Sequence, residues 1–185
     1  MPDKSIGPIQ DAQQAIMLVR QRAKEWNVDT AKVGVMGFSA GGHLASTAGT
    51  HFTKSYIDNP RKINLRPDFM ILVYPVISFA DSIGHIGSRD NLIGKNPSAQ
   101  QIALYSNELQ ITHETTPTFL IQVGDDGLVN VKNSIVFYLA LQKNNVPAGL
   151  HIFPKGQYGF PYEPAHSTWF QYSAQWLREN GWLKP

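Results

Sequence analysis

A serine between glycines, at the point where an apolar run meets a segment of small residues, constrains this chain more than any other feature. The apolar run extends from Val33 to Phe38, and the motif Gly37-Phe38-Ser39-Ala40-Gly41 leads into the segment Ala40 to His51. This order predicts a strand, a sharp turn and a helix. Glycine suits positions 37 and 41 because side chains there are expected to collide with neighbouring backbone. We therefore expect a strained Ser39 at the carboxyl edge of a sheet.

The rest of the chain alternates between patterns typical of helices and strands. Apolar residues recur every three or four positions from Ile9 to Trp26, which predicts an amphipathic helix. Buried strands are expected at Phe69–Tyr74 and Thr118–Val123, and another short strand at Gly149–Phe153. Further helices are expected at Val131–Asn144 and at Ser167–Asn180, the latter capped by Gly181. Residues 77–116 read as a loop-rich excursion over the sheet edge, with weak helical signals at 99–107. The alternation predicts one α/β domain over residues 1–185, with a mainly parallel sheet and helices on both faces.

Composition narrows the possible functions. The 185 residues are 42% hydrophobic and only 16% charged, which fits one globular domain and excludes a disordered chain. The formal net charge is +2 with scattered Lys and Arg, so no nucleic-acid partner is expected. The absence of cysteine and of His or carboxylate clusters at metal-ligand spacing argues against a metal or another cofactor. No apolar run of about 20 residues and no signal-peptide pattern occur, so we expect no membrane contact and a cytoplasmic or otherwise soluble location.

The carboxyl end of the strand at Thr118–Val123 carries a candidate acid. Gly124-Asp125-Asp126-Gly127 follows this strand, and open α/β sheets hold their sites at this edge. A serine hydroxyl becomes a nucleophile when a base removes its proton, and either aspartate would orient such a base. The backbone N–H of Ala40 is the candidate donor to a developing oxyanion. The alternatives are an Asp-Gly turn with solvated carboxylates and a tight turn in which Ser39 is incidental.

Several segments together make the chain resemble the α/β-hydrolase esterases of the acetyl-esterase and acetylxylan-esterase-like group. They are residues 11–26, 37–45, 87–94, 125–126 and 153–156, and the resemblance covers nearly the whole chain. It implies a serine carboxylester hydrolase that acts by acyl transfer on a small ester, with acetyl groups on a carbohydrate as the expected substrate. It also implies that Asp126, three residues before Val129, is the acid of the catalytic triad.

The expected histidine of this family is replaced. The family has a Gly-His-Gly-Phe-like segment where this chain has Gln157-Tyr158-Gly159-Phe160. A phenol with a pKa near 10 is a poor proton acceptor at neutral pH, whereas imidazole titrates near 6.5. His166 is the candidate replacement base. We expect Gly41, His85 and Tyr158 to contact substrate, and His43 to be a packed helix residue.

The resemblance also concerns the region before the first helix. Such esterases have further strands there and a His-Gly-Gly-Gly-like oxyanion loop, which this chain lacks. We therefore expect an N-terminally truncated fold in which Val33–Phe38 is an exposed edge that drives homo-oligomer formation. The alternative function is a catalytically impaired remnant that serves as a binding or interaction domain. A flavodoxin-like binding module is disfavoured because no phosphate loop is recognisable.

Overall fold

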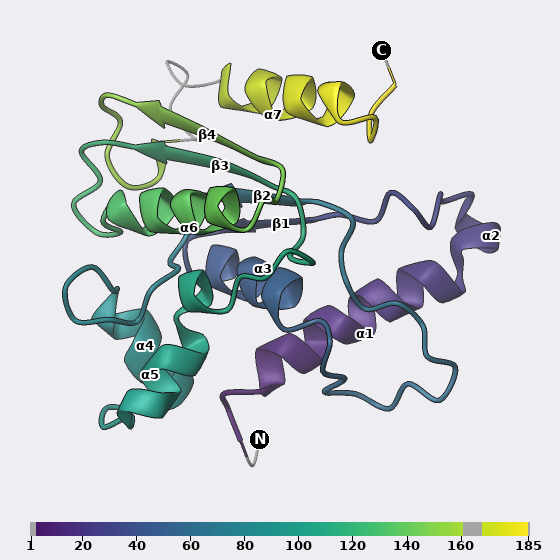
Figure 1. The fold of residues 1–185 in the computed structure, drawn as a ribbon, viewed down its shortest axis with the longest axis horizontal. Helices are drawn as coiled ribbons and strands as arrows, with labels where there is room; N and C mark the ends of the chain where they lie inside the picture. The colour runs from purple at the N-terminus through teal and green to yellow at the C-terminus, as the bar shows by residue number, and fades with distance from the viewer. Residues whose placement is uncertain (1–2, 161–167, 185) are drawn as a thin grey trace.

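A four-stranded parallel sheet forms the centre of the protein. The computed structural model describes residues 3–160 and 168–184. The strands are β1 (Val35–Phe38), β2 (Met70–Val73), β3 (Thr118–Val123) and β4 (Ala148–Phe153), and they lie side by side in chain order (Figure 1). Every residue of β2 and β3 is buried, which is why both strands are nearly continuous apolar runs in the sequence.

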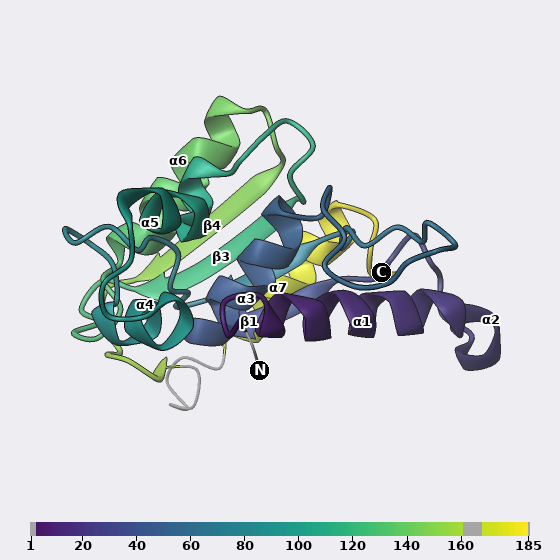
Figure 2. The ribbon, with the colours of Figure 1, turned by 90° about the horizontal axis from the view of Figure 1, so that it is seen from below.

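Helices cover both faces of this sheet and confirm the predicted fold class. On one face lies α7 (Thr168–Glu179), which ends before Gly181 as expected. On the other face lie α3 (Ala40–Thr50) and α6 (Lys132–Lys143), with α1 (Gly7–Gln21) packed against α3 (Figures 1 and 2). Alternate strand residues serve the two cores. The α3 and α6 side contains Met70, Leu72, Leu120, Phe137 and Leu141, and the α7 side contains Ile71, Val73, Ile121, Phe160 and Trp176.

The helix predicted over Ile9 to Trp26 is divided in two. Arg22, with φ −98° and ψ 13°, separates α1 from the short α2 (Ala23–Trp26). Asn27 then adopts a left-handed conformation with φ 53° and ends α2. The sequence pattern predicts that Trp26 extends the buried stripe of α1. This prediction is wrong, because Trp26 is 44% exposed.

The segment 77–116 contains more helix than its sequence indicates. It includes α4 (Ile86–Ile93), α5 (Ala99–Tyr105) and a 3₁₀ turn, η1 (Asn107–Leu109). The only buried residue of α4 is Ile93, so this helix has no apolar periodicity to predict it. The fully buried Asn107 docks η1 on α3, because its Nδ2 donates to the carbonyl of His43 at 3.1 Å and to Ser46 Oγ at 2.7 Å.

Strand β1 lies at one edge of the described sheet, as predicted. It pairs with β2, and its Met36 side chain is 43% exposed. Self-association through this edge stays a prediction. Among the helices in the described part of the chain, none has the length and apolar character needed to cross a bilayer.

His43 joins α3 to the segment 77–116 and is a packed helix residue, as predicted. It is 4% exposed, its Nε2 lies 2.8 Å from the Tyr105 carbonyl oxygen, and its ring stacks on Phe79 with centroids 4.4 Å apart. Burial lowers the pKa of His43 to about 4, against the opposing effect of the Tyr105 carbonyl. The side chain is therefore neutral at pH 7.

We predict that protonation of His43 destabilises the fold in mild acid. Its pKa is near 6.5 in the unfolded chain and about 4 in the folded protein, so the unfolded state binds more protons between these values. The contribution of His43 to the free energy of unfolding is fully lost only below its folded pKa: relative to its value above pH 6.5, it falls by about 3 kcal/mol as the pH approaches 4. Urea unfolding at several pH values will measure this slope. His43→Gln should be less stable at pH 7 and show a shallower slope, and an unchanged slope would contradict the assignment.

Candidate active site

Ser39 occupies the turn between β1 and α3 in a strained backbone conformation. Its φ of 51° and ψ of −123° lie outside the regions that residues other than glycine normally adopt. Its N–H donates to the Val73 carbonyl at 3.2 Å, and its carbonyl accepts from the N–H of Val76 at 3.0 Å. The end of β2 and the loop after it therefore hold the turn in place, and the expected strand, turn and helix are confirmed.

The two glycines of the motif differ in how much space their surroundings leave for a side chain. A Cβ at Gly37 would lie 2.2 Å from the carbonyl oxygen of Gly41, so the close approach of strand and helix excludes any side chain there. A Cβ at Gly41 would meet no atom within 4 Å. The expectation that both positions exclude side chains is therefore correct for Gly37 and wrong for Gly41.

Tyr158 contacts Ser39 directly. Its phenolic O–H donates to Ser39 Oγ at 2.8 Å, and its side chain is 44% exposed. The ring packs edge-on against Tyr74 with centroids 5.1 Å apart. In this arrangement Ser39 accepts a hydrogen bond, whereas a general base at the same place would accept the proton of the serine.

Tyr74 is a site residue that the sequence analysis missed. It follows β2 with a φ of 37°, and its N–H donates to the Ile121 carbonyl at 2.7 Å. Its buried ring also packs edge-on against Phe38 and Phe160, with centroids 5.9 and 5.8 Å away. A left-handed tyrosine has no sequence signature, because tertiary contacts impose the conformation.

The two aspartates after β3 hold different parts of the site. Asp126 Oδ1 accepts the N–H groups of Leu128 and Val129, each at 2.9 Å, and Oδ2 accepts from Gln122 Nε2 at 3.3 Å. Asp125 Oδ1 instead accepts the N–H groups of Gly156 and Gln157 at 2.9 and 3.0 Å. Within the described residues, Asp125 rather than Asp126 is therefore bonded to the turn that carries Tyr158.

The other residues predicted for the site lie on different elements of the fold. Ala40 is the first residue of α3, so its N–H lies at the helix N-terminus next to Ser39. His85 caps the N-terminus of α4, where its Nδ1 lies 2.8 Å from Ser88 Oγ. His166 lies outside the described residues. The described residues contain no group of three or more His, Asp or Glu side chains able to hold a metal ion.

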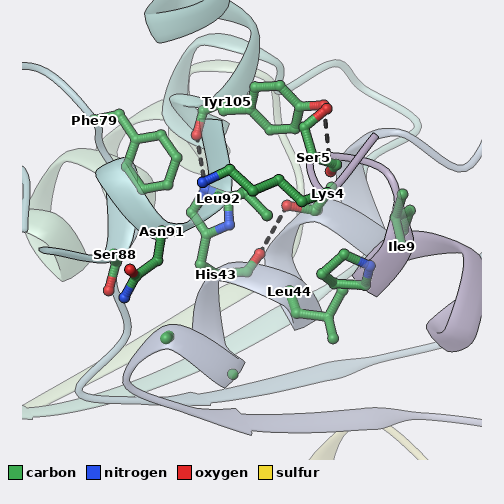
Figure 3. Close-up of a pocket in the computed structure, with 14 residues that line it drawn as sticks. Lys4, Ser5, Ile9, His43, Leu44, Phe79, Ser88, Asn91, Leu92 and Tyr105 are labelled. Atoms are coloured by element: carbon green, nitrogen blue, oxygen red, sulfur yellow. Dashed lines mark hydrogen bonds between the residues drawn. The ribbon is translucent and has the colours of Figure 1, made fainter. Parts of the chain in front are cut away.

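A cavity of about 420 Å³ lies beside the first turn of α3. Figure 3 shows Phe79, Ser88 and Asn91 on one side of it, and Ile9 and Leu44 on the opposite side. Gly41 lines this cavity, as do residues of α1, α4 and α5 and the chain before α1. Apart from Ala40, Gly41 and His43, none of its lining residues was given an individual role by the sequence analysis.

The parallel sheet, the helices on both faces and the strained serine between β1 and α3 define the α/β-hydrolase fold. Within that class the chain belongs to the BD-FAE family of esterases, whose model matches residues 4–141.

The chain is similar to several characterised proteins. It is 40% identical to an acetyl ester-xyloside bifunctional hydrolase from Caldicellulosiruptor lactoaceticus, with a TM-score of 0.91 over 99% of this chain and 69% of that one. It is 38% identical to an acetylxylan esterase of Xylanibacter ruminicola over 98% of this chain. It is also 35% identical to endo-1,4-beta-xylanase B of Butyrivibrio fibrisolvens over 82% of this chain. The chain spans 36% and 24% of the lengths of these two curated relatives.

The two motif glycines provide a matched pair of stability measurements. We predict that Gly37→Ala lowers the free energy of unfolding by at least about 2 kcal/mol, because its Cβ overlaps the Gly41 carbonyl. Gly41→Ala should leave stability unchanged or raise it by up to about 1 kcal/mol, because alanine favours a helix and meets open space. Urea unfolding of both variants will measure the difference. Equal losses in the two variants would contradict this account of the turn.

Proposed function

We propose that this chain is a serine carboxylester hydrolase domain that transfers the acyl group of a small ester to Ser39. Acetyl groups on a carbohydrate are the proposed substrate class. The observation that carries the proposal is the conformation of Ser39, strained at the junction of β1 and α3. The 38% identity to an acetylxylan esterase and the 40% identity to an acetyl ester-xyloside hydrolase support the choice of substrate.

The proposed reaction proceeds in two acyl transfers. Ser39 Oγ attacks the ester carbonyl carbon while its proton passes to a base, and the resulting oxyanion accepts the N–H of Ala40 at the N-terminus of α3. The ester C–O bond then breaks, and the alcohol leaves with that proton. Water attacks the acyl-Ser39 carbonyl in turn and releases the carboxylic acid. Asp126 is the proposed acid that orients the base.

This chain departs from the usual scheme in the group that would accept the proton of Ser39. Tyr158 is positioned on Ser39 Oγ, but there its O–H donates a hydrogen bond instead of accepting the proton of the serine. His166 is the proposed base, and without its help the rate would be lower by roughly 10²- to 10⁴-fold. Tyr158 then serves as a hydrogen-bond donor that holds the serine oxygen.

A second candidate function is an impaired hydrolase that retains ester binding. The hydrogen bond from Tyr158 to Ser39 favours it, because that bond directs a donor toward the oxygen that must become nucleophilic. The bonds of Asp126 within its own loop favour it as well. Such a domain would hold an ester beside Ala40 without turning it over.

Replacement of the serine tests the nucleophile. We predict that Ser39→Ala removes nearly all hydrolysis of p-nitrophenyl acetate and all covalent labelling by a fluorophosphonate probe, because both require Ser39 Oγ. Ser55→Ala is the control, since Ser55 is an exposed residue whose hydroxyl bonds to the Ile57 carbonyl. Undiminished hydrolysis by Ser39→Ala would refute the assignment.

Replacement of the tyrosine tests the base. Tyr158→His should raise ester hydrolysis by roughly 10²- to 10⁴-fold if the remaining site is assembled, because an imidazole then faces Ser39. Tyr158→Phe is the matched control, since it removes the O–H without adding a base. If Tyr158→His brings no gain and His166→Ala abolishes the parental rate, the base is His166. If His166→Ala leaves a substantial parental rate, His166 is not the base.

A further inference from the structure

A long loop between α3 and β2 contains a second cavity. Residues 51–69 include no helix or strand, and Figure 1 shows this segment next to α1, between the end of α3 and the start of β2. Loops of more than about 12–15 residues without secondary structure are uncommon, and those that are ordered are usually functional. The loop follows the C-terminus of α3, whereas Ser39 precedes its N-terminus. The length of this helix, roughly 16 Å, therefore separates the loop from the serine.

Side chains of α1 hold this loop in one shape. The buried Gln13 donates through Nε2 to the Lys54 carbonyl at 2.8 Å and accepts the N–H of Tyr56 at 2.8 Å. Arg20 Nη1 donates to the Asn64 carbonyl at 3.0 Å. The backbone of the loop is therefore in place before any ligand binds.

The loop is also closed by bonds between its own residues. Asn59 makes two bonds with the backbone of Ile63: its Nδ2 donates to the carbonyl at 2.8 Å, and its Oδ1 accepts the N–H at 2.9 Å. Ser55 Oγ donates to the Ile57 carbonyl at 2.7 Å. These two polar side chains support the shape of the loop.

Other polar side chains of the loop are available to a ligand. The cavity has a volume of about 420 Å³, and all of its lining residues lie within 52–65. We call it the loop cavity. In the part of the chain that the structure describes, several polar groups of its lining have no hydrogen-bond or ion-pair partner. They are the Asp58 carboxylate, the Lys62 ammonium group, the Thr53 hydroxyl and Asn64 Nδ2.

These groups suit a neutral ligand that carries hydroxyls. Asp58 accepts hydroxyl protons, Lys62 and Asn64 Nδ2 donate to hydroxyl oxygens, and Thr53 does either. The formal charges of Asp58 and Lys62 cancel, so the lining attracts neither anions nor cations as a class. The rest of the lining is apolar and consists of Phe52, Ile57, Pro60, Ile63 and Leu65. A sugar ring combines hydroxyls at its edge with C–H groups on its faces and so matches both parts of this lining.

We propose that the loop cavity binds a neutral pyranose unit and anchors the protein on a polysaccharide, apart from the site at Ser39. The inference rests on the proposed function for the choice of a carbohydrate polymer. The volume of about 420 Å³ lies within the usual range for small-molecule pockets. A polymer held at this distance from Ser39 leaves the serine open to an ester elsewhere on the same material. Anchoring therefore raises the effective concentration of esters at the serine.

Xylohexaose, a neutral oligosaccharide without ester groups, tests binding apart from catalysis. In ¹H–¹⁵N spectra of the parent chain we expect saturable shifts of the amide signals of residues 52–65. Asp58→Ala and Lys62→Ala should each weaken binding at least about fivefold, because each removes a charged hydrogen-bonding group. Thr53→Trp should weaken binding as much by filling the cavity without a change of charge.

Arg61→Ala is the matched control for Lys62→Ala. Arg61 is the exposed neighbour of Lys62 and carries the same charge, but it is not part of the lining. Its replacement should leave the affinity for xylohexaose unchanged. Absence of saturable shifts in residues 52–65, or equal losses in Lys62→Ala and Arg61→Ala, would overturn the proposal.

Two further probes test the class of ligand and the anchoring. Inorganic phosphate should cause no saturable shift in residues 52–65, and binding of phosphate without binding of xylohexaose would make the loop cavity an anion site and overturn the proposal. The parent chain and Arg61→Ala should sediment with insoluble xylan at least about fivefold more than Lys62→Ala. Equal sedimentation of all three would overturn the anchoring.

These measurements separate the inference from the proposed function. If no ester is hydrolysed but xylohexaose binds at residues 52–65 and is weakened by Asp58→Ala, the loop cavity binds sugar and the proposed hydrolysis fails. If p-nitrophenyl acetate is hydrolysed through Ser39 but xylohexaose does not bind at residues 52–65, the sugar site fails and the proposed hydrolysis stands.

Discussion

The close approach of Gly37 to the carbonyl of Gly41 is the contact on which the arrangement of this molecule depends. It allows α3 to start directly after β1, with Ser39 held in the turn by backbone bonds to Val73 and Val76. The position of α3 then determines where residues 77–116 dock, because His43 and Asn107 bridge them. The cavity between α1, α3, α4 and α5 follows from the same placement. A steric constraint at one glycine thus defines both the serine and its surroundings.

An aromatic cluster defines the opposite side of the serine. Tyr74 packs edge-on against Phe38, Tyr158 and Phe160, and so links the ends of β1 and β2 to the turn after β4. Edge-to-face contacts restrict the orientation of each ring more than aliphatic packing does. The phenol of Tyr158 therefore reaches Ser39 from a supported position, although nearly half of its side chain is exposed. The surroundings of Ser39 therefore depend on this aromatic support as well as on the residue that bonds to it.

Local, periodic signals account for the parts of the fold that the sequence predicts. The bounds of β3 are correct because a fully buried strand is a continuous apolar run, and the turn at Ser39 carries its own glycine pattern. The split between α1 and α2 was not predicted, because the backbone angles of one residue do not change the apolar pattern. Helix α4 was not predicted, because it is capped by His85 and has no periodic apolar residues. In the site, the left-handed Tyr74 and the bonds of Asp125 to Gly156 and Gln157 arise from contacts between distant segments. Such contacts have no counterpart in the local pattern.

Two of the hydrogen bonds that hold the turn after β4 do not depend on the side chain that the turn presents. Asp125 holds it through the backbone N–H groups of Gly156 and Gln157, and these bonds do not involve the side chain of residue 158. Tyrosine and histidine codons differ by a single nucleotide, so one point mutation exchanges the two side chains. The two bonds from the turn to Asp125 do not depend on which of these side chains is present.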